Sequence, residues 1–453
     1  MDKRASWGSR IGFIFAAAGS AIGLGNIWRF PYLVGNHGGA AFIAVYLICL
    51  LLIGFPVLIS EILIGRTAQS SPCGAFRSLG RGRGWAWIGR MTIITGFIVS
   101  AFYSAVAGWI LGYLYETILG QTTSFHTPGE AAQHFTSVLG DPFWTVGFHF
   151  LFITLSAGIL FFGVRKGIEL GNKVMMPLLF AVLIALVIKG LTMHGAMDGM
   201  EFLLSPDWSV LTPTAIILAL GQSFFTLSLG QGTMVTYGSY LGKQDNMVKS
   251  CVPIVVMDTL VAFLAAIAIF TIVFSVGLQP GSGPGLIFMT LPVVFSQIPG
   301  GYFFACLFFL LVFLAALTSE ISALEPAIAY LVDEKKWRRR TAVIVCWLGA
   351  FILGVPSALS FSTFKDVSFG GMNFLDLFSF TSTSILVPLG GFCAAVLVGW
   401  RWGFANAWNA LKEGFAAYFD ARPWLKRYFW FCIKFSAPIL IVFILLHAFL
   451  YPE

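Results

Sequence analysis

The sequence predicts an all-α membrane protein that crosses the bilayer eleven times. Of its 453 residues, 58% are hydrophobic and only 10% are charged, whereas a soluble domain carries about a quarter charged residues. Apolar runs of about 18 or more residues recur along nearly the whole chain, and each could cross a hydrocarbon core about 30 Å thick. The runs lack the alternation of polar and apolar residues that membrane β-strands show. A polytopic bundle of helices is therefore expected.

The predicted spans are continuous apolar stretches separated by short polar loops. In order along the chain they are 11–35, 40–65, 87–118, 143–163, 168–189, 212–240, 252–278, 301–332, 342–357, 374–399 and 428–450. The seven cysteines and six histidines are dispersed and show no metal-ligand or redox spacing, so no metal-dependent catalysis and no organic cofactor is expected.

The basic residues predict the orientation of these spans. Most of the 27 lysines and arginines lie in loops on one side, and the opposite side carries only Lys189 and Lys365. Because cytoplasmic loops are enriched in basic residues, we expect a cytoplasmic N-terminus and, with eleven spans, an extracytoplasmic C-terminus. The net charge of +7 is spread over short loops rather than gathered on one domain, so no nucleic-acid partner is expected.

Two spans contain small and polar residues at mid-membrane. Residues 19–26 read GSAIGLGN, and residues 224–232 read FFTLSLGQG. Glycines alone would be explained by close helix packing. Buried polar groups such as Asn26, Thr226 and Gln231 are not needed for packing, and backbone breaks inside a membrane occur only where protein or a water-filled cavity covers them. These two segments therefore predict broken helices at a binding site.

The two broken helices are the first and the sixth span, which are corresponding positions in two sets of five. Paired interruptions of this kind indicate an inverted-repeat transporter. Helix N-termini at the breaks favour an anionic group, and freed carbonyl groups can coordinate Na⁺. We expect residues 1–453 to form one domain, with a first five-helix repeat at 11–190, a second at 212–399, and an extra helix at 428–450.

Three motifs resemble the neurotransmitter:sodium symporter family, and most closely its bacterial amino-acid transporters. They are GSAIGLGNIWRFP at 19–31, GQSFFTLSLGQG at 221–232 and LAALTSEISALEP at 314–326, and the resemblance extends from Trp7 to at least Gly391. The family usually has twelve helices, against eleven here. The resemblance implies sodium-coupled symport of an L-amino acid by alternating access in a bacterial inner membrane. The protein would be a monomer or a weakly associated dimer.

The resemblance also implies which residues bind the substrate and two sodium ions. The substrate pocket would be lined by Ser20, Ala21, Gly23, Leu24, Gly25, Val99, Tyr103, Phe225, Thr226, Ser228, Gln231, Ser319 and Ala323. The first sodium site would use Ala21, Asn26, Thr226 and Asp258, with the substrate carboxylate. The second would use Gly19, Ile22, Ala315, Thr318 and Ser319.

The pocket residues bear on the substrate. Amine-transporting relatives carry an Asp at the position of Gly23, so a glycine there implies an α-amino acid that brings its own carboxylate. An apolar wall of Val99, Leu24 and Phe225 favours hydrophobic or aromatic substrates. Gln231 stands where the bacterial pattern often has a large apolar residue, which leaves open a substrate with a polar side-chain end.

Charged residues give further expectations. The resemblance implies a cytoplasmic gate of Arg4 and Asp333 and an outer gate in which Arg29 meets an acid, Asp376, although Ser379 could occupy that register. Buried charge in a membrane has to be balanced.

Bacterial relatives often balance the first sodium with an acid one turn beyond Asp258, where this chain has Ala262. Asp258 is therefore expected both to bind the first sodium ion and to balance its charge, so that chloride is not required.

Other buried groups receive partial assignments. Glu61 would accept hydrogen bonds from the unwound backbone of the sixth span, and the segment from Gly167 to Pro177 resembles an element that unwinds to release sodium. Glu320 and Glu325 have no assigned role. The alternative functions are an amino-acid sensor on the transporter fold, a channel, and an intramembrane enzyme, although no nucleophile lies in a motif with an activating base.

Overall fold

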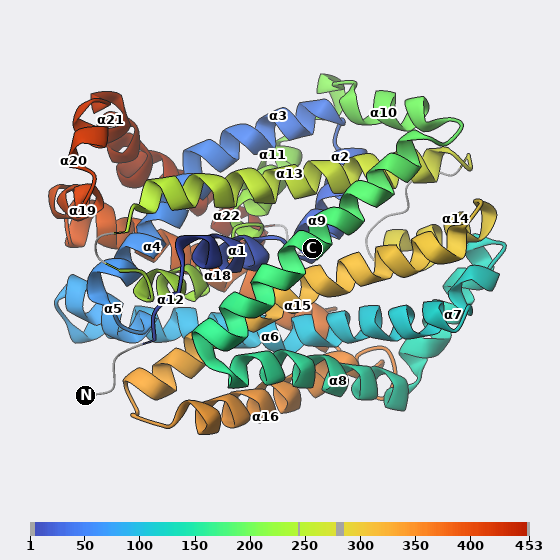
Figure 1. Cartoon of the computed structure of the whole chain (residues 1–453), viewed down its shortest axis with the longest axis horizontal. Helices are drawn as coiled ribbons and strands as arrows, with labels where there is room; N and C mark the ends of the chain where they lie inside the picture. The colour runs from blue at the N-terminus through green and yellow to red at the C-terminus, as the bar shows by residue number, and fades with distance from the viewer. Residues whose placement is uncertain (1–4, 243–244, 278–284, 451–453) are drawn as a thin grey trace.

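The computed structural model describes residues 5–242, 245–277 and 285–450, and these residues are almost entirely helical. Figure 1 shows long helices running side by side along the long axis of the molecule. Within these three stretches there is no strand, and only two isolated β-bridges occur, between Gly39 and Pro206 and between Phe369 and Met372. The all-helical prediction is confirmed.

The first five predicted spans correspond to long helices or to helices joined end to end. They are α1 (Arg10–Ala21) with η1 (Gly25–Arg29) and α2 (Phe30–Asn36), α3 (Ala40–Cys49) with η2 (Leu50–Gly54) and α4 (Phe55–Ala68), α6 (Arg83–Ile118), α8 (Pro142–Phe161), and η4 (Val164–Glu169) with α9 (Leu170–Leu191). Here η1, η2 and η4 are π-helical turns that continue the neighbouring helix.

The remaining spans are found in the same way. They are α11 (Pro213–Phe225) with α12 (Thr233–Ser239), α13 (Met247–Phe274), α15 (Gly301–Asp333), α16 (Arg339–Ala358), α17 (Phe374–Ser379) with η7 (Phe380–Leu386), α18 (Val387–Val396) and η8 (Leu397–Arg401), and α21 (Pro423–Phe431) with η9 (Cys432–Ser436) and α22 (Ala437–Leu450).

Short helices fill the loops, where the sequence pattern did not predict them. They are α5 (Pro72–Gly80), η3 (Thr122–Ser124), α7 (Pro128–Gly140), α10 (Ala196–Leu204), η5 (Trp208–Val210), η6 (Leu286–Thr290) with α14 (Leu291–Gln297), α19 (Phe404–Lys412) and α20 (Ala416–Asp420). Several begin with a proline in the first turn, where its missing N–H is not needed.

The number of spans agrees with the prediction only in part. Nine helices within the described residues are long and apolar enough to cross a membrane, or ten when α1 and α2, which meet at a bend of 52°, are taken as one span. The remaining expected span, 212–240, consists of α11 and α12, separated by Thr226–Gly232. A total of eleven spans therefore stays a prediction.

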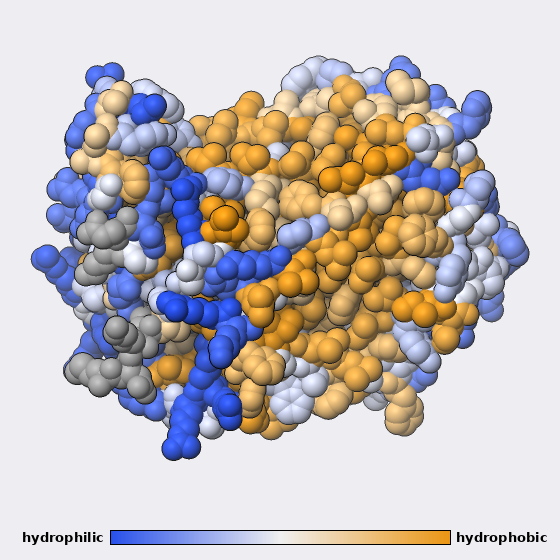
Figure 2. Space-filling view, in the orientation of Figure 1, coloured by the Kyte–Doolittle hydropathy of each residue, from blue (hydrophilic) through white to orange (hydrophobic). Residues whose placement is uncertain are grey.

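The surface has the polarity expected of a membrane protein. Figure 2 shows a broad hydrophobic band across the middle of the molecule and hydrophilic residues at both ends. Large apolar side chains on the membrane-length helices are exposed, among them Phe150, Ile188 and Val256. Lipid covers such side chains without the cost that water would impose, which explains why the helices are apolar on their outer faces.

The broken first helix lies in the interior because its side chains are small. In α1, Ala16, Ala17 and Ala18 are fully buried, and α1 packs against α9, α13 and α15. A Cβ atom added at Gly19 would lie 2.2 Å from Asn172 Oδ1 of α9. Small side chains let helix backbones approach closely within a bilayer, so the sequence GSAIGLGN both opens the helix and places it at the centre.

Candidate functional site

The break in the first helix is held open by two side chains that accept its freed N–H groups. Ile22 has an extended conformation, and η1 begins only at Gly25. The Gly23 N–H donates to Asn26 Oδ1 over 3.1 Å, and the Leu24 N–H donates to Tyr103 Oη over 3.4 Å. Buried amides need partners, so these contacts replace the missing helical bonds.

The break in the sixth span depends on left-handed backbone and on one buried carboxylate. Ser228, Gly230 and Gly232 have φ angles of 52°, 75° and 80°. A Cβ atom at Gly230 would lie 1.9 Å from the Val387 carbonyl oxygen, so only glycine fits there. The Gly230 N–H donates to Glu61 Oε1 over 2.7 Å, which confirms the hydrogen bond predicted for Glu61.

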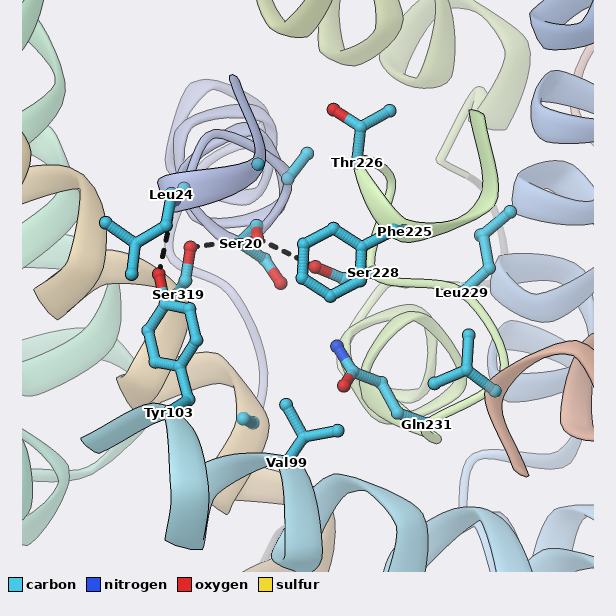
Figure 3. Close-up of a pocket in the computed structure, with 15 residues that line it drawn as sticks. Ser20, Leu24, Val99, Tyr103, Phe225, Thr226, Ser228, Leu229, Gln231 and Ser319 are labelled. Carbon is cyan, nitrogen blue, oxygen red and sulfur yellow. Dashed lines mark hydrogen bonds between the residues drawn. The ribbon is translucent and has the colours of Figure 1, made fainter. Parts of the chain in front are cut away.

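The two breaks border one cavity. Figure 3 shows the side chains that line it, with Tyr103 and Gln231 entering from different sides. All thirteen residues expected to bind substrate line this cavity, and two others that the sequence did not indicate, Leu229 and Val387, join them. Both additions are apolar; Leu229 lies inside the motif at 221–232, whereas Val387 meets the motif residues only in the folded chain.

Polar groups in the cavity gather around the first break. Ser228 Oγ donates to the Ser20 carbonyl over 2.7 Å, and Ser319 Oγ donates to the same carbonyl over 3.2 Å (Figure 3). Gln231 is only 8% exposed, and no hydrogen bond from its side chain to another described residue is present. A buried amide without a protein partner is costly, so its polar end needs a partner inside the cavity.

A second polar cluster lies directly behind the cavity and contains three of the four residues expected at the first sodium site. Asn26 Nδ2 donates to Asp258 Oδ1 over 2.8 Å and to Thr226 Oγ1 over 3.1 Å. Thr226 Oγ1 donates to Asp258 Oδ1 over 2.8 Å. Each of the three is at most 1% exposed. Ala21, the fourth expected residue, lines the cavity together with Thr226.

A third cluster contains the residues expected at the second sodium site. Ser319 Oγ lies 3.4 Å from the Gly19 carbonyl oxygen and 3.3 Å from that of Ile22. Thr318 Oγ1 donates to the Ala315 carbonyl over 3.0 Å. Carbonyl and hydroxyl oxygens from α1 and α15 thus converge, and hard cations prefer such oxygen ligands.

Asn172 is a residue at this cluster that the sequence did not indicate. It is fully buried on α9, and its Oδ1 accepts no hydrogen bond from the described residues. This oxygen lies against Gly19, as does Thr318. A polar residue within the segment Gly167–Pro177 would have been the only sequence signal. That segment is helical here, so its unwinding stays a prediction.

On the side of the predicted outer gate, the cavity adjoins a second hollow. Arg29 and Asp376, the two residues expected at the outer gate, both line this hollow, as do Phe225 and Ser379. Phe225 also lines the inner cavity, so its side chain separates the two spaces. The Arg29 guanidinium lies 5.7 Å from the centre of the Phe225 ring.

The opposite side is closed by the N-terminal segment. Trp7 Nε1 donates to the Tyr237 carbonyl over 3.0 Å, and the Trp7 N–H donates to the Tyr240 carbonyl over 3.2 Å. The Trp7 ring packs edge-on against both tyrosines. Of the expected cytoplasmic gate, Asp333 Oδ2 accepts from the Ser71 N–H over 2.8 Å, and Arg4 lies outside the described residues.

Glu325, which had no assigned role, anchors this closed side. Its carboxylate is fully buried and forms a two-pronged ion pair with Arg339, with distances of 2.8 and 2.7 Å. Tyr240 Oη donates to Glu325 Oε1 over 2.7 Å. Glu320, the other unassigned acid, accepts a short hydrogen bond from Ser100 Oγ. A buried carboxylate in a membrane span needs such partners.

Comparisons with known proteins agree with this geometry. YhdH of Bacillus subtilis, an uncharacterized sodium-dependent transporter, is 37% identical over 98% of both chains. A sodium-dependent transporter of Haemophilus influenzae is 36% identical over 98% of this chain and 97% of its own. The crystal structure of MhsT in complex with L-phenylalanine is similar with a TM-score of 0.89, at 41% identity, over 98% of this chain and 100% of that one.

Animal relatives are more distant. The sodium- and chloride-dependent taurine transporter of Rattus norvegicus is 27% identical over 94% of this chain and 76% of its own. The model of the sodium:neurotransmitter symporter family matches residues 4–129 and 131–452, which is nearly the full length. The chain therefore belongs to the sodium:neurotransmitter symporter family.

Proposed function

We propose that this sodium-dependent transporter carries an L-amino acid into the cell together with two sodium ions, by alternating access. The observation that supports this most is the position of Thr226, which belongs both to the cavity and to the cluster of Asn26 and Asp258. A substrate in the cavity would therefore share polar atoms with a cation beside it. Such direct contact makes the affinity for one depend on the other.

The cavity favours a ligand that carries a carboxylate. Tyr103 Oη and the N-terminal end of η1 lie at one edge, and the positive end of the helix dipole attracts anions. A Cβ atom at Gly23 would lie 2.6 Å from Ser319 Oγ and 3.1 Å from Tyr103 Oη. A side-chain carboxylate in place of Gly23 would fill this edge, so the glycine leaves room for the carboxylate of an amino acid.

The walls favour a hydrophobic or aromatic side chain. Val99, Leu229, Val387 and Phe225 are apolar residues of the lining. The solved structure of MhsT holds L-phenylalanine, which is in keeping with a site of this kind. Gln231 offers the only amide of the lining, and a substrate with a polar group at the end of its side chain would satisfy it.

The two oxygen-rich clusters are proposed as sodium sites. In the first, Asp258 would touch the ion directly and balance its charge, since Ala262 offers no carboxylate one turn further on. The taurine transporters are described as chloride-dependent as well as sodium-dependent. We expect no chloride requirement here, because a resident carboxylate supplies the negative charge that a chloride ion would otherwise bring.

In the second sodium site, Gly19, Ile22, Ala315, Thr318 and Ser319 would supply oxygens. Asn172 Oδ1 would be a further oxygen ligand of the ion. The site would then join α1, α9 and α15, so that loss of the ion loosens the contact of α9 with its neighbours. The protein would lie in a bacterial inner membrane with its N-terminus in the cytoplasm, where most of its basic residues gather.

Uptake into proteoliposomes tests this function. A radiolabelled amino acid such as L-phenylalanine should accumulate when sodium is outside, and a sodium ionophore should abolish accumulation. Substitution of potassium for sodium is the control.

An amino-acid sensor built on this fold would bind substrate in a sodium-dependent manner without accumulation. Membership of a family of symporters argues against an intramembrane enzyme.

A further inference from the structure

A groove runs between α8 and α16, and its lining residues are separate from those of the substrate cavity. It is almost wholly apolar and is lined by Thr154, Ala157, Gly158, Phe161, Val343 and Trp347, with two further apolar side chains. Neither helix contributes a residue of this groove to the sites described above, so transport chemistry does not account for it.

The groove exists because α8 has the small residues Ala157 and Gly158 where it faces α16, so their side chains do not fill the space between the two helices. A Cβ atom at Gly158 would meet no atom within 4 Å, so the helix leaves open space there. Trp347 Nε1 donates to Thr154 Oγ1 over 3.1 Å and closes one end of the groove. From Thr154 to Phe161, α8 rises about 10 Å at 1.5 Å per residue. That length lies within one leaflet of a hydrocarbon core about 30 Å thick.

The other end of the groove is cationic. The Arg340 guanidinium lies 5.1 Å from the centre of the Phe161 ring, where α8 ends and α16 begins. Arg338 and Arg340 are exposed, whereas Arg339 is held by Glu325. Figure 2 shows the hydrophilic end of the molecule beside the hydrophobic band at this place, near the start of α16 in Figure 1.

The acids at this end are already paired. Glu325 binds Arg339, and Glu169 is buried and binds Lys173. Arg165 donates to Ser6, so its position beside the end of α8 is fixed. In the connection between α15 and α16, Glu334 pairs with Arg77 over 3.0 Å and Asp333 accepts the Ser71 N–H. The described acids near Arg340 are therefore engaged with other groups.

We propose that this groove binds one anionic phospholipid, with an acyl chain against Gly158 and the phosphate on Arg340. The apolar groove lies within one leaflet and fits an acyl chain. Its basic end at Arg340, on the side predicted to be cytoplasmic, attracts anionic headgroups. The lipid would hold α8 and α16 together where Arg339, through Glu325, supports the closed side of the transporter. The binding of the lipid is independent of the proposed amino-acid substrate.

Native mass spectrometry of the purified full-length protein tests the site. The protein is mixed with phosphatidylglycerol or phosphatidylcholine of identical acyl chains, and the lipid retained per chain is compared. We expect one phosphatidylglycerol to be retained about fivefold better than phosphatidylcholine, the preference that one basic residue at a headgroup confers. Gly158→Leu fills the groove and should abolish this retention, and Arg340→Gln should remove the preference for phosphatidylglycerol.

Two variants serve as matched controls. Gly147→Leu adds the same side chain to α8, at another glycine whose Cβ would meet no atom within 4 Å, and should retain the lipid. Lys426→Gln removes an exposed basic residue elsewhere and should keep the headgroup preference. Unchanged retention in Gly158→Leu would overturn the site, and so would equal retention of both lipids by the parent. A dimer that forms through this face and excludes lipid would also overturn it.

Discussion

Asn26 and Asp258 lie 232 positions apart in the chain and are joined by two hydrogen bonds, from Asn26 Nδ2 to the side-chain and main-chain oxygens of Asp258. The same Asn26 accepts the Gly23 N–H at the break of the first helix. One side chain thus connects the open backbone of span 1 to the only acid of α13. A change at either residue should affect both cation binding and the shape of the cavity.

Loss of the oxygen ligands should weaken sodium binding. Asn26→Ala and Thr318→Ala each remove one polar group from a different cluster. We expect the sodium concentration for half-maximal uptake to rise about tenfold in each, which corresponds to about 1.4 kcal/mol. Uptake measured over a series of sodium concentrations gives the result. Wild-type sodium dependence in either variant would show that its cluster is not a sodium site.

Asp258 should make chloride unnecessary. Uptake by the parent should be the same in chloride and in gluconate, because the carboxylate balances the charge of the ion. Asp258→Asn removes this charge and keeps the shape, so uptake should be lost or should become dependent on chloride. Strong chloride dependence in the parent would contradict the assignment.

Gln231 should control selectivity. Gln231→Phe replaces the amide with a large ring inside the cavity, so we expect the preference to move toward small aliphatic amino acids. Competition of alanine, leucine and tryptophan against a labelled substrate measures this shift. Unchanged relative affinities would place the side chain of Gln231 outside the contact surface of the substrate.

Asn172 should contribute to the second sodium cluster from α9. Asn172→Ala removes its unpaired Oδ1, and we expect sodium affinity to fall by several-fold, a smaller effect than Thr318→Ala. Leu170→Ala, an exposed position of the same helix, is the control and should behave as the parent. If the Asn172 variant also kept the sodium dependence of the parent, its oxygen would not reach the ion.

The pair of Glu325 and Arg339 should keep the cytoplasmic side closed. Arg339→Gln leaves a buried carboxylate without its partner, which costs about 3–5 kcal/mol in comparable pairs. We expect a shift toward an inward-open state, detected as faster labelling of a cysteine on the inner pathway. Arg338→Gln, at the exposed neighbour, is the control.

If Arg339→Gln does not fold, a double variant still tests the ion pair. The double change Glu325→Gln and Arg339→Gln removes both charges and avoids an unpaired carboxylate. It should fold and still label faster than the parent, because Tyr240 loses the carboxylate that holds it. Equal labelling in the double variant and the parent would show that the ion pair does not close the inner side.

The sequence by itself determined the helical membrane class and the location of the two breaks. Long apolar stretches without a polar–apolar alternation specify helices, because only helices and closed barrels satisfy the backbone in a bilayer and barrel strands alternate. Glycines and polar residues at 19–26 and 224–232 mark the breaks because only such residues tolerate left-handed or open backbone there. The family resemblance carried in these motifs is confirmed by the family model. The thirteen residues that the resemblance indicated for the substrate pocket all line one cavity.

The tertiary structure decided which distant groups meet. Val387 was not predicted at the site because it lies outside the motifs. Leu229 lies inside the motif at 221–232 and Asn172 inside the segment Gly167–Pro177, but nothing local shows that their side chains face the site. The pairing of Glu325 with Arg339 likewise depends on how α15 packs against α16. Periodicity and composition encode whether a residue is buried and how its backbone bends. The partner of a buried polar atom is set by packing between helices, which a single segment of sequence does not contain.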